Sequence, residues 1–101
     1  MNIVDVTMVR VYLAEGRKDL MAVEKWLQEK SNIHGYTVFR GIEGVGRDGH
    51  RHKASFIDLS SELPIVIEFF GLPEQVDVVL EQLQKLVRAD RIVSWPAKSG
   101  I

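Results

Sequence analysis

The first third of the chain shows two hydrophobic patterns in succession. Along residues 6–14, apolar side chains alternate with others, so one face of an extended chain would hold Val9, Val11 and Leu13. This period of two predicts a strand with one buried face. Residues 17–31 then carry large apolar side chains three or four positions apart, which predicts an amphipathic helix that ends near Ser31.

The rest of the pattern predicts further strands and one more helix. Residues 36–43 and 64–70 are rich in aromatic and β-branched types, which are typical of strands. Residues 73–88 place apolar side chains on one face of a helix and begin with a proline, which suits a first helical turn. We expect a short last strand over residues 91–95, ending at Pro96.

These elements follow one another in the order β-α-β-β-α-β. Two such halves commonly form a four-stranded antiparallel sheet with both helices on one face, so we expect an α+β, ferredoxin-like fold. The length of 101 residues suits a single domain with its own core, residues 1–101. Apolar residues occur on both predicted sheet faces, and we expect another copy of the chain to cover the face without helices; these positions are Val9, Tyr12, Phe39, Ile67 and Phe70.

Composition and charge narrow the classes of function. The absence of cysteine excludes disulfides, thiolate zinc sites, iron–sulfur clusters and cysteine nucleophiles. The formal charge of −1 argues against nucleic acid as the main partner, because proteins that bind its phosphate backbone usually have a strongly basic face. The most apolar stretch, residues 63–72, is shorter than the roughly 20 residues of a membrane span, so we expect no membrane insertion. No secretory signal is evident, and we expect a cytoplasmic protein.

Five of the eight glycines fall within residues 35–49. Residues 44–49 spell G-x-G-x-x-G, but a dinucleotide fold needs a helix to begin there, and the following His-Arg-His-Lys-Ala-Ser has no apolar period. A P-loop would need Lys-Ser or Lys-Thr after the glycines. Residues 44–55 therefore predict a loop, and residues 56–59 a short strand or a return arm.

The same region is locally basic. Residues 40–53 hold four cations against two carboxylates; the cations are Arg40, Arg47, Arg51 and Lys53. Main-chain N–H groups of a glycine-rich turn can cradle an anion, which favours a phosphate or nucleotide contact. The other interpretation is a solvated loop whose glycines merely make the turn.

Metal binding is an alternative for the two histidines of this loop. His50 and His52 flank Arg51, and a His-x-His pair with Asp48 nearby could bind zinc or copper. The neighbouring cations disfavour a divalent ion, and a fourth ligand is not evident. Contact with solvent or with a partner is the other interpretation of these histidines.

Catalysis has little support in the sequence. The residues cannot be arranged as a Ser/His/Asp triad without further assumptions, and the candidate carboxylates are scattered; these are Asp58, Glu62 and Glu68. Glu68 lies within an apolar strand, where an outward-facing position explains it more simply than a role as a base. We therefore expect that the protein is not an enzyme.

Nearly the whole chain resembles the PII-like superfamily of signalling proteins, and most closely a small branch known as a domain of unknown function. Residues 11–15, 35–46 and 59–68 carry the resemblance. It implies a non-catalytic regulatory homotrimer whose sheets face inward and whose subunit clefts bind a small anionic effector, often an adenine nucleotide such as AMP or ADP. A loop after the second strand, the T-loop of PII proteins, would report the bound state to a membrane channel or transporter, or to an enzyme.

The resemblance also suggests roles for individual residues. By position, Gly44, Gly46 and Arg47 would line the effector cleft beside Arg40. The 47–55 loop would contact the target through His50, Arg51, His52 and Lys53.

Two features depart from the family. The glycine-rich phosphate turn of PII proteins is missing from residues 86–92, where Arg88 and Arg91 would supply the positive charge instead. The loop contains no tyrosine, so the tyrosine modification of nitrogen-regulatory PII proteins is excluded. The alternative within the superfamily is a metal-binding trimer of the CutA type that uses His50 and His52.

Overall fold

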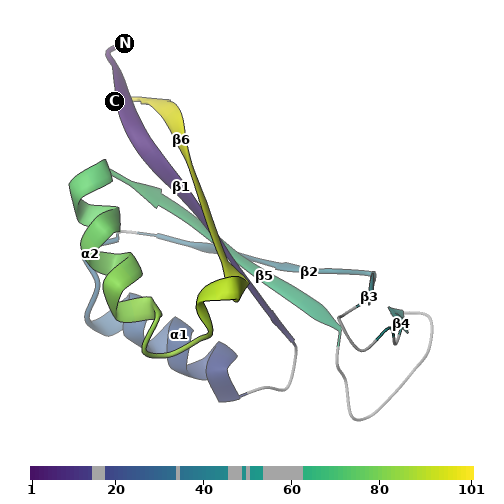
Figure 1. The fold of residues 1–101 in the computed structure, drawn as a ribbon. Helices are drawn as coiled ribbons and strands as arrows, with labels where there is room; N and C mark the ends of the chain where they lie inside the picture. The colour runs from purple at the N-terminus through teal and green to yellow at the C-terminus, as the bar shows by residue number, and fades with distance from the viewer. Residues whose placement is uncertain (15–17, 34, 46–48, 50, 54–62) are drawn as a thin grey trace.

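A computed structural model describes residues 1–14, 18–33, 35–45, 49, 51–53 and 63–101 (Figure 1). Its elements follow the chain in the order β1 (Ile3–Ala14), α1 (Lys18–Glu29), β2 (Thr37–Arg40), β3 (Glu43–Val45), β4 (Arg51–Lys53), β5 (Pro64–Gly71), α2 (Pro73–Leu83), the 3₁₀ turn η1 (Ala89–Arg91) and β6 (Ile92–Gly100).

The main sheet has the strand order β2-β5-β1-β6, and each neighbouring pair is antiparallel. Both helices lie on one face of this sheet (Figure 1). Strands β3 and β4 pair with each other as a separate two-stranded sheet. The α+β, ferredoxin-like prediction is therefore confirmed, with a small hairpin inserted between β2 and β5.

The core forms where the two central strands meet the helices. The β1–β5 register sets Val9 opposite Phe69, Val11 opposite Ile67 and Leu13 opposite Ile65, and all six side chains are buried. The two helices cover them with buried apolar residues; these are Val23, Leu27, Val76, Val79 and Leu83. Burial of apolar surface is the main favourable term in folding, so this layer holds the domain together.

Helix α2 ends earlier than predicted. Its last residue is Leu83, whereas the helix was expected to reach residue 88 because the apolar period continues to Val87. The backbone N–H groups of Lys85 and Leu86 donate to carbonyls three residues back, and this tighter spacing closes the helix. Val87 is nevertheless buried, so its apolar side chain packs in the core although its backbone lies in a turn after the helix.

The last strand runs past the residue that was expected to end it. Strand β6 continues through Pro96 to Gly100, with Pro96 opposite Thr7. Proline has no backbone N–H to donate to a neighbouring strand. It is tolerated here because β6 lies at the edge of the sheet and has a neighbouring strand on one side only.

The core can be tested with two valines on one helix. Val76 is fully buried, whereas Val78 is 59% exposed. Val76→Ala should lower the free energy of unfolding by about 2 kcal/mol through lost burial and the cavity left behind. Val78→Ala is the matched control and should change it by less than about 0.5 kcal/mol. Urea unfolding of both variants measures the difference, and equal losses would contradict this packing.

Candidate functional site

Two glycines of the glycine-rich region pack on one proline. The Gly41 N–H donates to the Pro64 carbonyl oxygen at 2.7 Å. A Cβ atom would lie 2.5 Å from Pro64 Cγ at Gly41 and 2.9 Å from it at Gly44, so only glycine fits at either position without a shift. This contact holds the start of the β3–β4 hairpin against the start of β5.

Two predictions for this region are wrong. The expected strand 36–43 is interrupted at Gly41 and Ile42, and its end belongs to the separate strand β3. The expected loop 44–55 contains β4 and the end of β3, which pair in the register Glu43 with Lys53, Gly44 with His52 and Val45 with Arg51. Gly49 has a φ of +78°, a conformation that glycine adopts without strain.

The predicted target-contact residues Arg51, His52 and Lys53 form β4. Gly46, Arg47 and His50 lie outside the described residues, as does the expected strand or return arm at 56–59. In the described part of the chain, no group of three or more His, Asp or Glu side chains could hold a metal ion. The metal alternative stays a prediction, because His50 lies outside the described residues.

The other predicted cations fall into two places. Arg40 ends β2, is exposed and pairs in register with Ile65. Arg88 precedes η1 and Arg91 ends it, and both are exposed. The Arg88 Nη2 atom donates to Asp90 Oδ2 at 2.6 Å, an ion pair whose side chains are 65% and 35% exposed.

A single chain sets these two groups on opposite edges of the sheet. Strand β2, with Arg40, is one edge, and β6, which follows Arg91 directly, is the other. Two strands separate them, so the edge strands are about 14 Å apart. Both groups lie toward the same end of the sheet, because Arg40 is opposite Ile65 and Ile92 is opposite Val11. Figure 1 shows the hairpin and η1 set apart in this way.

A hollow of about 740 Å³ lies at the other end of the sheet. It is open to solvent and is lined from β1, from the segment before β2, from the end of β5, from the start of α2 and from the C-terminus, with Val4, Val6, Ile33, Leu72 and Gln75 among its lining residues. Among the predicted effector residues that the structure describes, Arg40, Gly44, Arg88 and Arg91, none contributes to it. The hollow is therefore a different place from the described part of the predicted site.

The sheet face without helices carries an ion pair that the sequence did not reveal. Arg10 of β1 lies opposite Glu68 of β5, and the Arg10 Nε atom donates to Glu68 Oε2 at 2.6 Å. The Arg10 guanidinium carbon also lies 5.2 Å from the centre of the Trp95 ring, a cation–π distance. The hydrogen bond to Glu68, with a further contribution from Tyr12, raises the pKa of Arg10 above its ordinary value.

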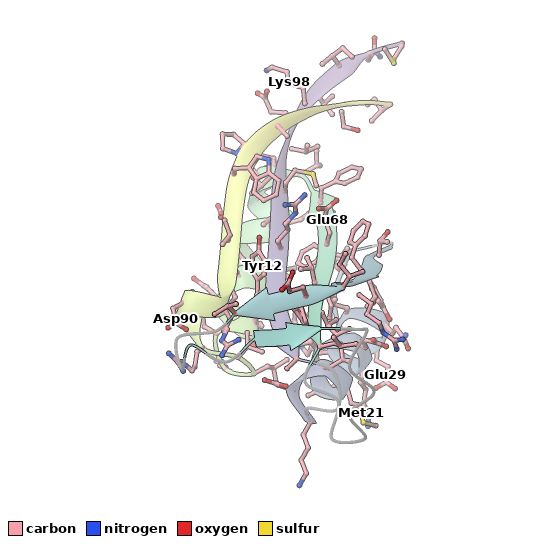
Figure 2. All side chains as sticks on the ribbon, turned by 90° about the vertical axis from the view of Figure 1, so that its right-hand side faces the viewer. Tyr12, Met21, Glu29, Glu68, Asp90 and Lys98 are labelled. Carbon is pink, nitrogen blue, oxygen red and sulfur yellow. The ribbon has the colours of Figure 1, made fainter. Side chains whose placement is uncertain are left out.

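This geometry explains why a carboxylate lies within an apolar strand, and the explanation needs no catalytic role for Glu68. The side chain points to the open face, as its strand position suggested, and is bound to a cation (Figure 2). The partners are 58 residues apart, so the only signal in the sequence was the isolated charge within each apolar strand. Neither helix in the described part of the chain has the length and apolar character of a membrane span.

Comparisons with known proteins agree on the family and the fold. The model of the family DUF190, described as Uncharacterized ACR, matches residues 6–99. A UPF0166 protein of Methanocaldococcus jannaschii is 32% identical over 90 residues, which cover 84% of this chain and 82% of the relative.

Two solved structures share the fold at low identity. CPII of Thiomonas intermedia K12, a nitrogen regulatory PII-like protein bound to ADP, AMP and bicarbonate, has a TM-score of 0.68 and 19% identity, covering 99% of this chain and 91% of its own. The divalent ion tolerance protein CutA1 of Ehrlichia chaffeensis has a TM-score of 0.62 and 12% identity, covering 95% and 82%. The family match confirms the expected branch, and the two structures confirm that this chain shares its fold with PII-like and CutA1 proteins.

The packing of Gly41 on Pro64 is open to a direct test. Gly41→Ala should lower the free energy of unfolding by about 1–3 kcal/mol, because the new methyl group overlaps the proline ring. Gly35→Ala is the control, since nothing lies within 4 Å of a Cβ atom there. Chemical unfolding measures both, and amide exchange of β3 should quicken in Gly41→Ala alone. Equal behaviour of the two variants would contradict the contact.

Proposed function

Because this chain belongs to the DUF190 family and has the fold of PII-like proteins, we propose that it is a non-catalytic regulatory protein that binds a small anionic effector. The adenine nucleotides AMP and ADP are the first candidates. The observation that carries the proposal is the fold shared over 99% of the chain with a PII-like protein bound to ADP and AMP. In this proposal residues 1–101 act as one cytoplasmic domain.

The effector site is built from two protomers. One supplies Arg40 and the hairpin base at Gly44, and its neighbour supplies Arg88 and Arg91. The support is the placement of these groups on opposite edges of the sheet, at the same end. A closed ring of three copies brings the β2 edge of each protomer to the β6 edge of the next, so every site is equivalent.

Arg88 can exchange its carboxylate partner for a phosphate. Its bond to Asp90 is an exposed ion pair, a class that contributes only about 0–1 kcal/mol. A phosphate oxygen accepts a charge-assisted hydrogen bond from the same guanidinium and carries more charge. Binding therefore costs little at Arg88 and adds a favourable contact.

The hairpin is the part that signals to a target. Arg40 is followed at once by Gly41, whose contact with Pro64 connects the sheet to β3 and β4. An effector bound at Arg40 shifts the hairpin to the extent that it binds one hairpin position better than another. The basic strand Arg51–Lys53 then contacts a membrane channel, a transporter or an enzyme.

Calorimetric titration with AMP, ADP and ATP tests the proposal. At least one nucleotide should bind, and Arg40→Ala should weaken its affinity about ten- to hundredfold by removing a charge-assisted hydrogen bond. Lys25→Ala removes an exposed cation from the outer surface of α1 and is the control. The nucleotide proposal fails if wild-type protein shows neither binding heat nor a shift in melting temperature with any of the three.

Mixed oligomers test whether two protomers share the site. Arg40→Ala and Arg91→Ala should each bind weakly alone. After co-refolding, an intact site forms wherever an Arg91→Ala protomer, which keeps Arg40, adjoins an Arg40→Ala protomer, which keeps Arg91. Random mixing should restore about a quarter of the sites, measured as calorimetric stoichiometry. If both arginines of a site came from one chain, mixing would restore none.

A further inference from the structure

The ribbon formed by β1 and β6 continues past the end of the other central strand. Pairing of β1 with β5 begins at Thr7, which lies opposite Gly71, whereas pairing of β1 with β6 extends back to Ile3. Figure 1 shows the two strands of this ribbon running on beyond α2 to the chain termini. Residues 3–6 of β1 therefore have a neighbouring strand on one side only, and their other side is a free edge.

The hydrogen bonds at the termini show which backbone groups point to this free edge. Asn2 and Ile101 exchange both of their N–H to C=O bonds, so they form a hydrogen-bonded pair. In an antiparallel ladder such pairs alternate with pairs that exchange no bond. The even-numbered residues of β1 therefore bond to β6, whereas Ile3 and Asp5 turn their N–H and C=O groups to the free edge.

The position of a proline agrees with this alternation. Pro96 has no N–H and lies opposite Thr7, an odd-numbered residue that does not bond to β6, so the ladder loses no hydrogen bond there. In the described part of the chain, no hydrogen bond engages the main-chain groups of Ile3 and Asp5. The free edge thus presents two donors and two acceptors.

The hollow of about 740 Å³ lies along this free edge. Val4 and Val6 line it from β1 and Ser99 lines it from β6, and the register places these three side chains on one face of the ribbon. Gly71 and Leu72 line it from the end of β5, and Leu72 is 44% exposed. A strand added beside β1 would therefore find an apolar surface for every second side chain.

The charges beside the free edge indicate the chemistry of a partner. Among the described residues that line the hollow, the charged one is the acidic Glu68. Asp5 lies on the free edge itself, and its side chain is 73% exposed. Its ion pair with Lys98 is on the β6 side and is exposed, a class that contributes little to stability. A basic side chain opposite Asp5 on an added strand would form a second cross-strand pair with it.

We propose that residues 3–6 bind an extended segment of a partner protein as an added antiparallel β-strand. The segment has the pattern apolar–basic–apolar. Its two apolar side chains enter the hollow opposite Val4 and Val6, and its basic side chain lies opposite Asp5. Its backbone completes the hydrogen bonds left open at Ile3 and Asp5, the mode in which a peptide extends a sheet. This edge is separate from the β2 and β6 edges of the proposed effector site, and the proposal does not depend on nucleotide binding.

Methylation of a peptide backbone tests the strand pairing. The probe is the acetylated and amidated peptide Thr-Val-Lys-Val-Thr, titrated into the full chain. A methyl group on the lysine backbone nitrogen removes the donor that faces Asp5, so binding should weaken at least about tenfold. The same methyl group on the backbone nitrogen of the second valine, which faces away from β1, is the matched control. It should change the affinity by less than about threefold.

A reversal of charge tests the predicted basic residue. Wild-type protein should prefer the lysine peptide to the glutamate version, Thr-Val-Glu-Val-Thr, by about threefold or more, and Asp5→Lys should invert this preference. Glu81→Lys makes the same change of charge at an exposed position of α2 outside the hollow, and it should keep the wild-type preference. Circular dichroism shows whether each variant is folded. A folded Asp5→Lys protein with the wild-type preference would contradict the predicted pairing.

Amide hydrogen exchange identifies the binding site. Bound peptide should slow exchange at Ile3 and Asp5, whereas Val4 and Val6, which already bond to β6, should change less. The proposal is overturned if no binding occurs at about 1 mM peptide, if both methylated peptides bind alike, or if the slowed amides lie elsewhere. It is also overturned if Ile3 and Asp5 become protected as protein concentration rises without peptide, because a second copy of the chain would then occupy the edge.

Discussion

The packing of β1 and β5 against the two helices is the interaction on which the rest of the molecule depends. Val9, Val11 and Leu13 can be buried on one side only if Met8, Arg10 and Tyr12 point to the other, because side chains alternate along a strand. The same holds for β5, where burial of Ile67 and Phe69 turns Glu68 outward. The hydrophobic core thus determines the composition of the open face and brings Arg10 to Glu68.

The strand order has an equally direct consequence for binding. With β5 and β1 in the centre, β2 and β6 are left as the two edges, and the cations beside them are kept apart within one chain. Binding and assembly are therefore linked in the function we propose. The glycines at positions 41 and 44 connect the β2 edge to the hairpin through Pro64. One end of the sheet therefore holds both the cations proposed to bind an effector and the segment proposed to meet a target.

Much of the fold could be predicted from local patterns, and each failure has a physical cause. The alternation in β1 and the helical period in α1 and α2 are properties of short segments, so they identified those elements directly. The end of α2 at Leu83 was missed because Val87 is buried from a turn and continues the period. Pro96 was expected to stop a strand, and it is accommodated because β6 is an edge. The break at Gly41 depends on Pro64, 23 positions later in the chain.

For the site, the sequence by itself determined which groups are available: a locally basic, glycine-rich segment, two arginines before the last strand, and one isolated charge in each of two apolar strands. Such features are set by residue type and spacing over a few positions. Only the tertiary structure decided which of them meet. It paired Arg10 with Glu68 under Trp95, and it divided Arg40 from Arg88 and Arg91 between two edges. The reason is that strand order and register arise from packing the whole core, and residues far apart in the chain become neighbours only once that packing is complete.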